Sequence, residues 1–223
     1  MTSMSTPLFT DDEREAIRVA VAAAETRTAG EIVPYIVRRS GTYQVAVWRA
    51  ASLSALLAAV VSLAVAWLYD GWSLTWMYSA GWMAAVMALG GTAGAVLAAV
   101  ADPVRRALAG ADRLDLRVHR RAAEAFLDEE VFDTRDRTGI LLFVSLFEHR
   151  IEVVGDVGIN AKVEQAEWAE VVDLIRAGIL DESLAAGLVS AIERCGDLLH
   201  RRGVEVRPDD TDELPDDVRV RDE

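Results

Sequence analysis

TGILLFVSLFEHRIEVVG, residues 138–155, decides how the chain folds outside its two long apolar segments. The first ten residues form a short apolar run rich in β-formers, which predicts a buried central strand. EHR predicts a turn. IEVVG then predicts a second strand paired with the first, because Ile151 and Val153 alternate with Glu152 and Val154. The stretch therefore predicts two neighbouring strands of one sheet.

Helices and one further strand flank this pair in the sequence. Thr10 and Glu13 form a capping box ahead of a helix with apolar residues at helical spacing. EIVPYIVRR, residues 31–39, predicts a strand, in which Pro34 indicates an edge position or a bulge. Helices are expected at 101–110, at 113–132, and at about 162–177 and 182–202. The acidic, aperiodic end, residues 207–223, predicts a mostly disordered tail.

Two segments between these elements carry no charge, at residues 50–69 and 71–101. About 20 apolar residues suffice for a helix to cross the hydrocarbon core of a bilayer. We expect transmembrane helices near Val47–Tyr69 and Trp76–Ala101, joined by a short turn. Buried core helices of a soluble protein are the alternative. If the two helices cross the membrane, the hairpin at 47–101 interrupts one α/β domain built from residues 1–46 and 102–206.

Arginines flank this hairpin on one side only. Three precede the first segment and six follow the second, namely Arg38, Arg39, Arg49, Arg105, Arg106, Arg113, Arg117, Arg120 and Arg121. The connecting turn carries Asp70 and no basic residue. The positive-inside rule therefore predicts a multi-pass protein of the cell membrane with both termini cytoplasmic. Small residues at spacing four, Gly90 and Gly94 among them, predict close helix packing and allow a homo-oligomer through these faces.

Composition narrows the functions further. The net charge of −13 argues against nucleic acid as a partner. The single cysteine, Cys195, excludes an internal disulfide and lies in a helical pattern that favours a buried position. The three histidines show no metal-ligand spacing. The N-terminal residues lack the apolar core of a cleavable signal peptide.

Four stretches resemble the TPM domain family, also called the TPM phosphatase domain. They are TAGEIVPYIV (28–37), RTGILLFVSLFEHRIEVVGDVGIN (137–160), EWAEVVDLI (167–175) and DELPDDV (212–218). Together they cover the soluble part in the order and spacing of the family, so the chain is identified as a membrane-anchored, bacterial-type member. The resemblance implies a three-layer α/β/α sandwich with a small mixed sheet, here interrupted by the two-helix transmembrane hairpin.

The resemblance also implies a site beside the turn that holds Asp156, where a divalent cation such as calcium would bind. Many relatives have a further aspartate just after this turn, but this chain has Asn160 and Ala161 there, which removes a carboxylate ligand. The candidate rim comprises Asp156, Gly155, Gly158, Glu31 and Arg150. Glu31 and Arg150 each begin a strand, and the sequence leaves open whether they lie on the same rim as Asp156 or on the opposite one. The structural alternative for Asp156 is a turn aspartate that accepts hydrogen bonds from its own backbone.

Two functions follow from these observations. The first is a membrane-tethered accessory or regulatory module for a membrane protein complex, with the lipid bilayer as its second partner. The second is a divalent-cation-dependent phosphatase acting on phosphate esters, because some members of the family are acid phosphatases. The sequence contains no P-loop, no paired-aspartate motif of the haloacid type and no cysteine–arginine phosphate loop. It therefore favours the first function and names no certain cofactor.

Overall fold

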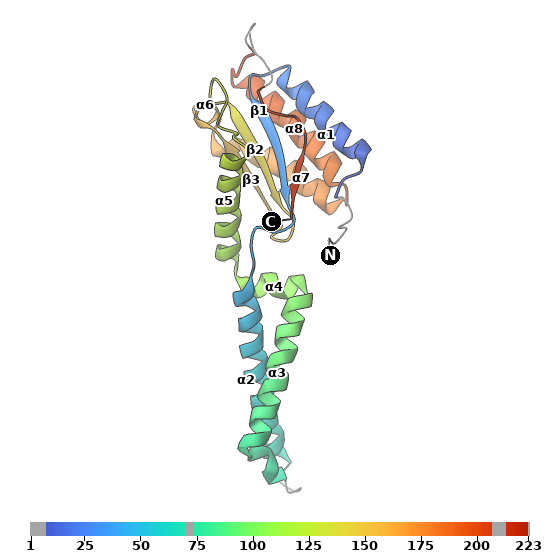
Figure 1. The fold of residues 1–223 in the computed structure, drawn as a ribbon, viewed down its shortest axis with the longest axis vertical. Coiled ribbons are helices and arrows are strands. Elements are labelled where there is room, and N and C mark those ends of the chain that lie inside the picture. The colour runs from blue at the N-terminus through green and yellow to red at the C-terminus, as the bar shows by residue number, and fades with distance from the viewer. Residues whose placement is uncertain (1–7, 70–73, 207–212, 223) are drawn as a thin grey trace. The chain divides into compact units, whose positions relative to one another are not determined.

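The computed structural model describes residues 8–69, 74–206 and 213–222. The chain divides into two compact units. One, the α/β body, contains Met1–Ser40 and Arg117–Glu223, and the other, the hairpin unit, contains Gly41–Leu116. The fold is mixed α/β with a four-stranded sheet (Figure 1).

The sheet lies in the α/β body and has the strand order β3-β2-β1-β4. Its strands are β1 (Glu31–Val37), β2 (Gly139–Ser145), β3 (Arg150–Gly155) and β4 (Arg219–Arg221). β1 is parallel to both β2 and β4, whereas β2 and β3 are antiparallel. The two strands expected within 138–155 are therefore confirmed as neighbours, with Ile140 opposite Gly155 and Ser145 opposite Arg150.

The edge position expected from Pro34 is wrong, because β1 lies between β2 and β4 in the sheet. The backbone N–H of Glu31 donates to Thr138 O on the β2 side, and that of Ile32 donates to the Glu25 carboxylate on the other side. Because alternate residues of a strand face the same way, the nitrogen of Pro34 faces the same side as that of Ile32. β4 pairs with β1 only from Tyr35 onward. The missing N–H therefore costs no ladder hydrogen bond.

Helices cover both faces of the sheet, which explains why every residue of β1 and β2 is buried. On one face lie α1 (Asp11–Glu25), α7 (Ala169–Leu180) and α8 (Leu184–Arg201), and on the other lies α5 (Ala111–Asp128) (Figure 1). Alternate side chains of β2 supply the two cores: Ile140 and Leu142 belong to one, and Leu141 and Phe143 to the other. Two short elements, α6 (Val157–Asn160) and η2 (Gln165–Trp168), connect β3 to α7.

The helices of the body begin and end close to the predicted positions. Thr10 and Glu13 form the expected capping box at α1, where the Thr10 N–H donates to the Glu13 carboxylate at 2.8 Å. The helix expected at 162–177 is replaced by η2 and α7, which together span 165–180. The last long helix begins at Leu184, two residues later than expected.

The C-terminal segment is a correction to the expected disorder. Within the described residues 213–222, β4 forms on β1, and the Arg38 N–H extends the pairing by donating to Arg221 O at 3.0 Å. The alternation of Arg219, Val220 and Arg221 explains the strand, because Val220 packs against the core while the arginines face the other side. The remainder of the predicted tail, 207–212 and 223, lies outside the described residues.

The hairpin unit contains α2 (Gln44–Leu68), η1 (Leu74–Tyr78), α3 (Ala80–Val100) and α4 (Asp102–Ala109). α2 and α3 pack along their length, with the glycines of α3 against α2. A Cβ added at Gly90 would lie 2.7 Å from Ala58 Cβ, and one at Gly94 would lie 2.6 Å from Ala50 O. The expected close packing is therefore present. The Gly90/Gly94 face serves the hairpin itself, so a homo-oligomer would have to use another face.

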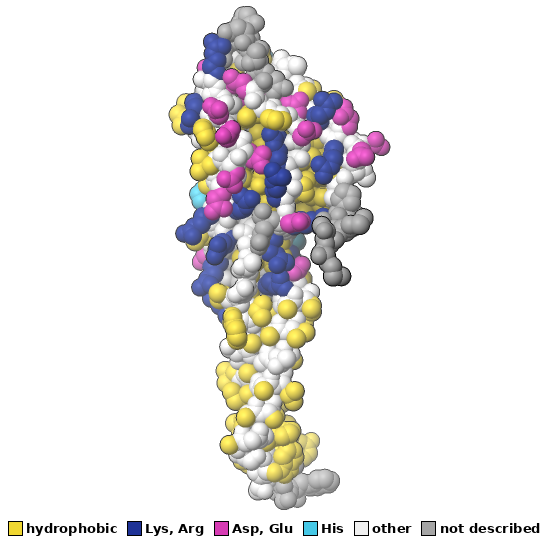
Figure 2. Space-filling view, in the orientation of Figure 1, with side chains coloured by type: hydrophobic (Ala, Val, Ile, Leu, Met, Phe, Trp, Pro, Cys, Tyr) yellow, Lys and Arg dark blue, Asp and Glu magenta, His cyan; other side chains and the backbone are white. Residues whose placement is uncertain are grey.

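Both long helices of this unit are long and apolar enough to cross a membrane, by length and composition. Only 17% of the most apolar stretch of α2 is buried, and only 11% of that of α3. Large apolar side chains point outward instead, including Leu53, Leu56, Leu57, Val60, Val61, Leu89, Val96 and Leu97. Figure 2 shows hydrophobic side chains covering the hairpin on the face in view.

Candidate functional site

Asp156, the expected centre of the site, is the N-cap of the short helix α6. Its Oδ1 accepts the Val157 N–H at 2.7 Å and the Arg137 Nη2 at 3.3 Å. Arg137 Nε also lies 2.8 Å from Oδ2, a charge contact without the alignment of a hydrogen bond. The Asp156 side chain is 4% exposed. The carboxylate is therefore engaged by its own backbone and by a guanidinium, which matches the structural alternative for this residue.

The two glycines beside Asp156 allow close contact between segments. A Cβ at Gly158 would lie 2.7 Å from Arg137 O, while the Gly158 N–H donates to the same oxygen at 2.9 Å. A Cβ at Gly155 would lie 2.9 Å from Ile159 Cγ2. Asn160 Nδ2 closes the turn by donating to Gly155 O at 2.6 Å. Gly158 therefore permits the turn to pack against residues 136–137, while Gly155 leaves room for the side chains of Ile159 and Asn160.

Glu31 lies at the same end of the sheet as Asp156, because Glu31 pairs with Gly139 and Gly155 pairs with Ile140. Its side chain is buried. One carboxylate oxygen lies 3.4 Å from the Glu213 N and the other 3.3 Å from the Leu214 N, and both accept those N–H groups. Glu31 therefore fixes the start of the C-terminal segment.

Arg150 is not part of this rim. It begins β3 opposite Ser145, at the other end of the sheet from Gly155. At about 3.3 Å per residue, the six residues of β3 separate the two ends by roughly 17 Å. The structure thus brings Glu31 and Asp156 to one end of the sheet and leaves Arg150 at the opposite end.

The described residues also supply few ligands for a cation at Asp156. Among them, no three His, Cys, Asp or Glu side chains gather in an arrangement that could hold a metal ion. His119 instead lies 2.8 Å from Glu152, through its Nδ1. Calcium prefers six to eight oxygen ligands, so the cation site remains a prediction that depends on the family resemblance.

A buried polar cluster at the opposite end of β1 and β2 was not anticipated from the sequence. Ser145 and Ser40 share a hydrogen bond of 2.7 Å between their hydroxyls, and Ser145 Oγ also donates to Glu148. The Ser40 N–H donates to Glu148 Oε1 at 2.9 Å. All three residues are buried, so Ser145 is not accessible as a nucleophile. The cluster fixes Ser40, the last residue of the first part of the body.

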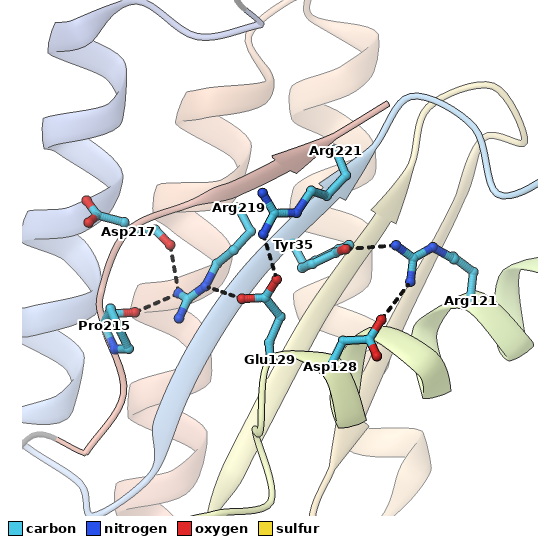
Figure 3. Close-up of polar contacts among 8 residues, drawn as sticks. All are labelled: Tyr35, Arg121, Asp128, Glu129, Pro215, Asp217, Arg219 and Arg221. Atoms are coloured by element: carbon cyan, nitrogen blue, oxygen red, sulfur yellow. Dashed lines mark hydrogen bonds and ion pairs between the residues drawn. The ribbon is translucent and has the colours of Figure 1, made fainter. Parts of the chain in front are cut away.

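A second network, also missed, attaches β4 to the α5 side of the sheet (Figure 3). Glu129 accepts from Arg219 Nε at 3.3 Å and from Arg221 Nη2 at 3.1 Å. Arg219 Nη1 also donates to two backbone oxygens, those of Pro215 at 2.6 Å and Asp217 at 2.7 Å. The hydrogen bond with Glu129 and the charge of that residue raise the pKa of Arg221, and a smaller contribution comes from Tyr35. The only hint in the sequence was the alternation at 219–221.

Arg121 and Tyr35 continue this network along β1 (Figure 3). Arg121 Nη2 donates to the Tyr35 hydroxyl at 3.0 Å, and its Nη1 lies 3.7 Å from Asp128. The Tyr35 ring stacks on Phe143 with centroids 5.7 Å apart. The hydroxyl of this buried tyrosine is therefore satisfied by a side chain of α5, as burial of a polar group requires.

A surface groove of about 480 Å³ lies between η2, α7 and α8. Its lining includes two ion pairs, Arg194 with Glu170 and Arg202 with Glu167. The hydrogen bond from Arg194 lowers the pKa of Glu170, while that of Glu167 is lowered first by the Glu164 N–H and then by Arg202. The groove thus presents alternating charges, an arrangement that suits contact with a polar protein surface.

No protein-family model matches the sequence, and no curated protein matches it. Among solved structures, the chain is similar to the NMR structure of the BA42 protein from the psychrophilic bacterium Bizionia argentinensis. The two share 19% sequence identity with a TM-score of 0.59, and the match covers 99% of this chain and 100% of that chain. At this identity the likeness shows the fold alone.

Proposed function

We propose that this chain is a membrane-tethered, TPM-like accessory module. In this proposal α2 and α3 cross the cell membrane as a hairpin inserted in a three-layer α/β/α body, both termini are cytoplasmic, and the body contacts and regulates a membrane protein complex. The observation that carries the proposal is the outward-facing apolar surface of the hairpin.

This surface is unfavourable in water. Leu57 is 64% exposed and Leu89 is 73% exposed, and full burial of a leucine is worth about 1.5–3 kcal/mol. Hydrocarbon would accept such side chains without a protein partner. The helix lengths also fit, because 25 and 21 residues correspond to about 37 and 31 Å, against a hydrocarbon core of about 30 Å.

Three polar side chains on the two helices donate hydrogen bonds within the hairpin, an arrangement that suits a bilayer. Trp82 Nε1 donates to Ser62 Oγ at 2.9 Å across the pair. Ser52 and Thr92 each donate to the backbone oxygen four residues earlier, at 2.9 and 2.8 Å. Each of these hydroxyl and indole donors therefore has an acceptor within the hairpin.

Two arginines bind the free carbonyls at helix ends of the hairpin unit. Arg105 Nε donates to Ala98 O at 2.8 Å, at the end of α3, and Arg49 Nη1 donates to Leu108 O at 2.8 Å, near the end of α4. Guanidinium groups are favourable at the negative ends of helices. Arginines at the ends of α3 and α4 also fit the proposed orientation, because basic residues are enriched at the cytoplasmic side of transmembrane helices.

The body supports a contact role more than a catalytic one. A phosphatase of the family type would need the Asp156 carboxylate for a cation, but that group lies against Arg137 and the Val157 N–H. The charge-paired groove on α7 and α8 offers a concave surface without any such requirement. We therefore propose the accessory module in preference to the phosphatase.

Site-directed cysteine labelling tests the anchoring and the orientation. Cys195 is buried and burial raises its pKa to about 12, so an introduced cysteine is the reactive one. In intact cells, a membrane-impermeant maleimide is expected to label Thr75→Cys. It is expected to label Glu193→Cys, on the exposed face of α8, only after permeabilisation. Equal labelling of both before permeabilisation, or recovery of the chain in the soluble fraction, contradicts the proposal.

Crosslinking in native membranes tests the accessory role. A partner protein of the membrane should be recovered reproducibly with the unaltered chain. Its yield should fall when Arg194→Glu reverses one charge of the groove, whereas Arg18→Glu, a matched reversal on α1, should leave the yield unchanged. Recovery of no membrane protein above background would remove the accessory role.

A further inference from the structure

We infer that the first half of α5 is a docking surface for the headgroups of anionic phospholipids. The inference rests on the proposed membrane anchoring and deepens it by naming the lipid class. It also gives α5 a second role, because its other side packs against the sheet through Val118, Ala122 and Ala125.

Three arginines form one stripe on this helix. Arg113, Arg117 and Arg120 follow one another at spacings of four and three, which places them on one face. All three are exposed, and none of their guanidinium groups makes a hydrogen bond or an ion pair with any residue in the described part of the chain. Their neighbour Arg121 differs, because it binds Tyr35 and Asp128. The three guanidinium groups of the stripe are thus available for an external anion.

The stripe is unfavourable without such an anion. Like charges one helical turn apart repel each other. The charge is also polarised along the helix. Residues 111–121 carry four arginines and two aspartates, whereas 122–130 carry four acidic residues and no basic one. The basic half is the one that follows α3 and α4 in the chain, as expected if it lies near a bilayer surface.

An apolar residue within the stripe favours lipid over an acidic protein. Leu116 is 49% exposed and lies between Arg113 and Arg120, at helical spacing from both. Exposed leucine flanked by arginine is typical of helices that lie in the interface of a bilayer. There the leucine meets acyl chains while the guanidinium groups meet phosphates. Figure 2 shows Lys and Arg side chains gathered over the first half of α5.

The test uses the full chain reconstituted in nanodiscs, with an environment-sensitive fluorophore on Leu116→Cys. One set of discs contains phosphatidylcholine alone, and the other contains phosphatidylcholine with phosphatidylglycerol. We expect a blue-shifted emission and quenching by lipid-borne quenchers only with phosphatidylglycerol. Each arginine should change the ratio of docked to free helix about fivefold, the factor that corresponds to about 1 kcal/mol per basic side chain.

Two variants and one additive separate the outcomes. Replacing Arg113, Arg117 and Arg120 by Gln should abolish the effect of phosphatidylglycerol. The matched control replaces Arg14, Arg18 and Arg176 by Gln, removes the same charge elsewhere, and should leave the effect intact. Excess inorganic phosphate with phosphatidylcholine discs should cause no shift. A shift caused by phosphate alone would assign the stripe to a soluble phosphate and overturn the lipid assignment.

The remaining results distinguish this inference from the proposed function. Incorporation into both discs with identical spectra overturns the inference and leaves the anchoring in place. Loss of the effect in the control variant assigns it to net charge and also overturns the inference. Failure to enter either disc contradicts the anchoring and, with it, the docking surface.

Discussion

Glu129 is the residue on which the attachment of β4 depends. Its side chain is 18% exposed, and that of its partner Arg219 is 10% exposed. Glu129→Gln would leave two guanidinium groups without their shared carboxylate, at an expected cost of about 1–3 kcal/mol. Hydrogen exchange of the full chain in detergent should show faster exchange at 219–221. Glu124→Gln, on the exposed face of α5, which ends one residue before Glu129, is the control. Equal exchange in both variants would contradict the role of Glu129.

Gly158 and Gly155 provide a matched pair of substitutions. Ala at Gly158 would place a Cβ against two backbone oxygens, those of Asp136 and Arg137, which cannot rotate away. Ala at Gly155 would meet side-chain atoms of Ile159 and Asn160, which can move. Thermal unfolding should show a loss of about 1–3 kcal/mol for Gly158→Ala and a smaller loss for Gly155→Ala. The reverse order would indicate that residues 136–137 do not constrain this turn.

Cys195 gives the body a defined sensitivity to alkali. Burial raises its thiol pKa from 9.0 to about 12, with Glu25 as a second cause. The unfolded thiol ionises near pH 9 while the folded one stays neutral, so the contribution to stability is complete below pH 9 and is lost as pH rises toward 12. Urea unfolding at pH 8 and pH 10.5 should show a larger decrease in the free energy of unfolding than for Cys195→Ala. Equal decreases would mean that the thiol is solvated.

At the scale of elements, sequence periodicity predicted the strands and helix ends that are determined by residues within the same segment. The β2–β3 pair follows from alternation and from a short turn, and the capping box at Thr10 follows from local hydrogen bonds. It missed the element whose formation depends on residues far away in the sequence, namely β4. β4 exists because β1 and Glu129 stabilise three residues that are too few for a strand by themselves. Pro34 suggested an edge because the sequence does not show where β4 begins.

The same division holds for the candidate site. The sequence located Asp156 at a glycine-flanked turn beside β3, which is where it lies. Its partner, Arg137, was not predicted, because that contact requires the 134–138 turn to fold back against α6. The sequence also left open on which rim Arg150 lies, and the antiparallel register places it at the end of the sheet opposite Asp156.

Gly94 is the position at which α3 depends on α2. A side chain there would meet Ser54 and the Ala50 carbonyl, so Gly94→Leu should separate the two helices. Spin labels at Trp48→Cys and Val100→Cys, both exposed, should report a longer and broader distance distribution. Gly81→Leu is the control, because a Cβ at Gly81 has no atom within 4 Å. An unchanged distribution for Gly94→Leu would contradict this packing.

At the scale of the whole molecule, the surrounding solvent decides what an exposed leucine is worth. Leu57→Arg should lower membrane insertion strongly, because arginine in the centre of a transmembrane helix costs about 2.5–3.5 kcal/mol. Leu180→Arg, at a residue of the body that is 76% exposed, should change stability by less than about 0.5 kcal/mol. The measurement is the fraction of each variant recovered in carbonate-washed membranes. Equal recovery would favour a hairpin in water.

The position of the hairpin between β1 and β2 constrains the order of events during synthesis. Residues 31–37 pair with residues 139–145, so the first strand leaves the ribosome about a hundred residues before its neighbour. A membrane insertion apparatus would receive α2 and α3 within that interval. Under the proposed anchoring, the bilayer would hold both segments before the centre of the sheet closes, so biogenesis itself would prevent a mature body from being released without its anchor.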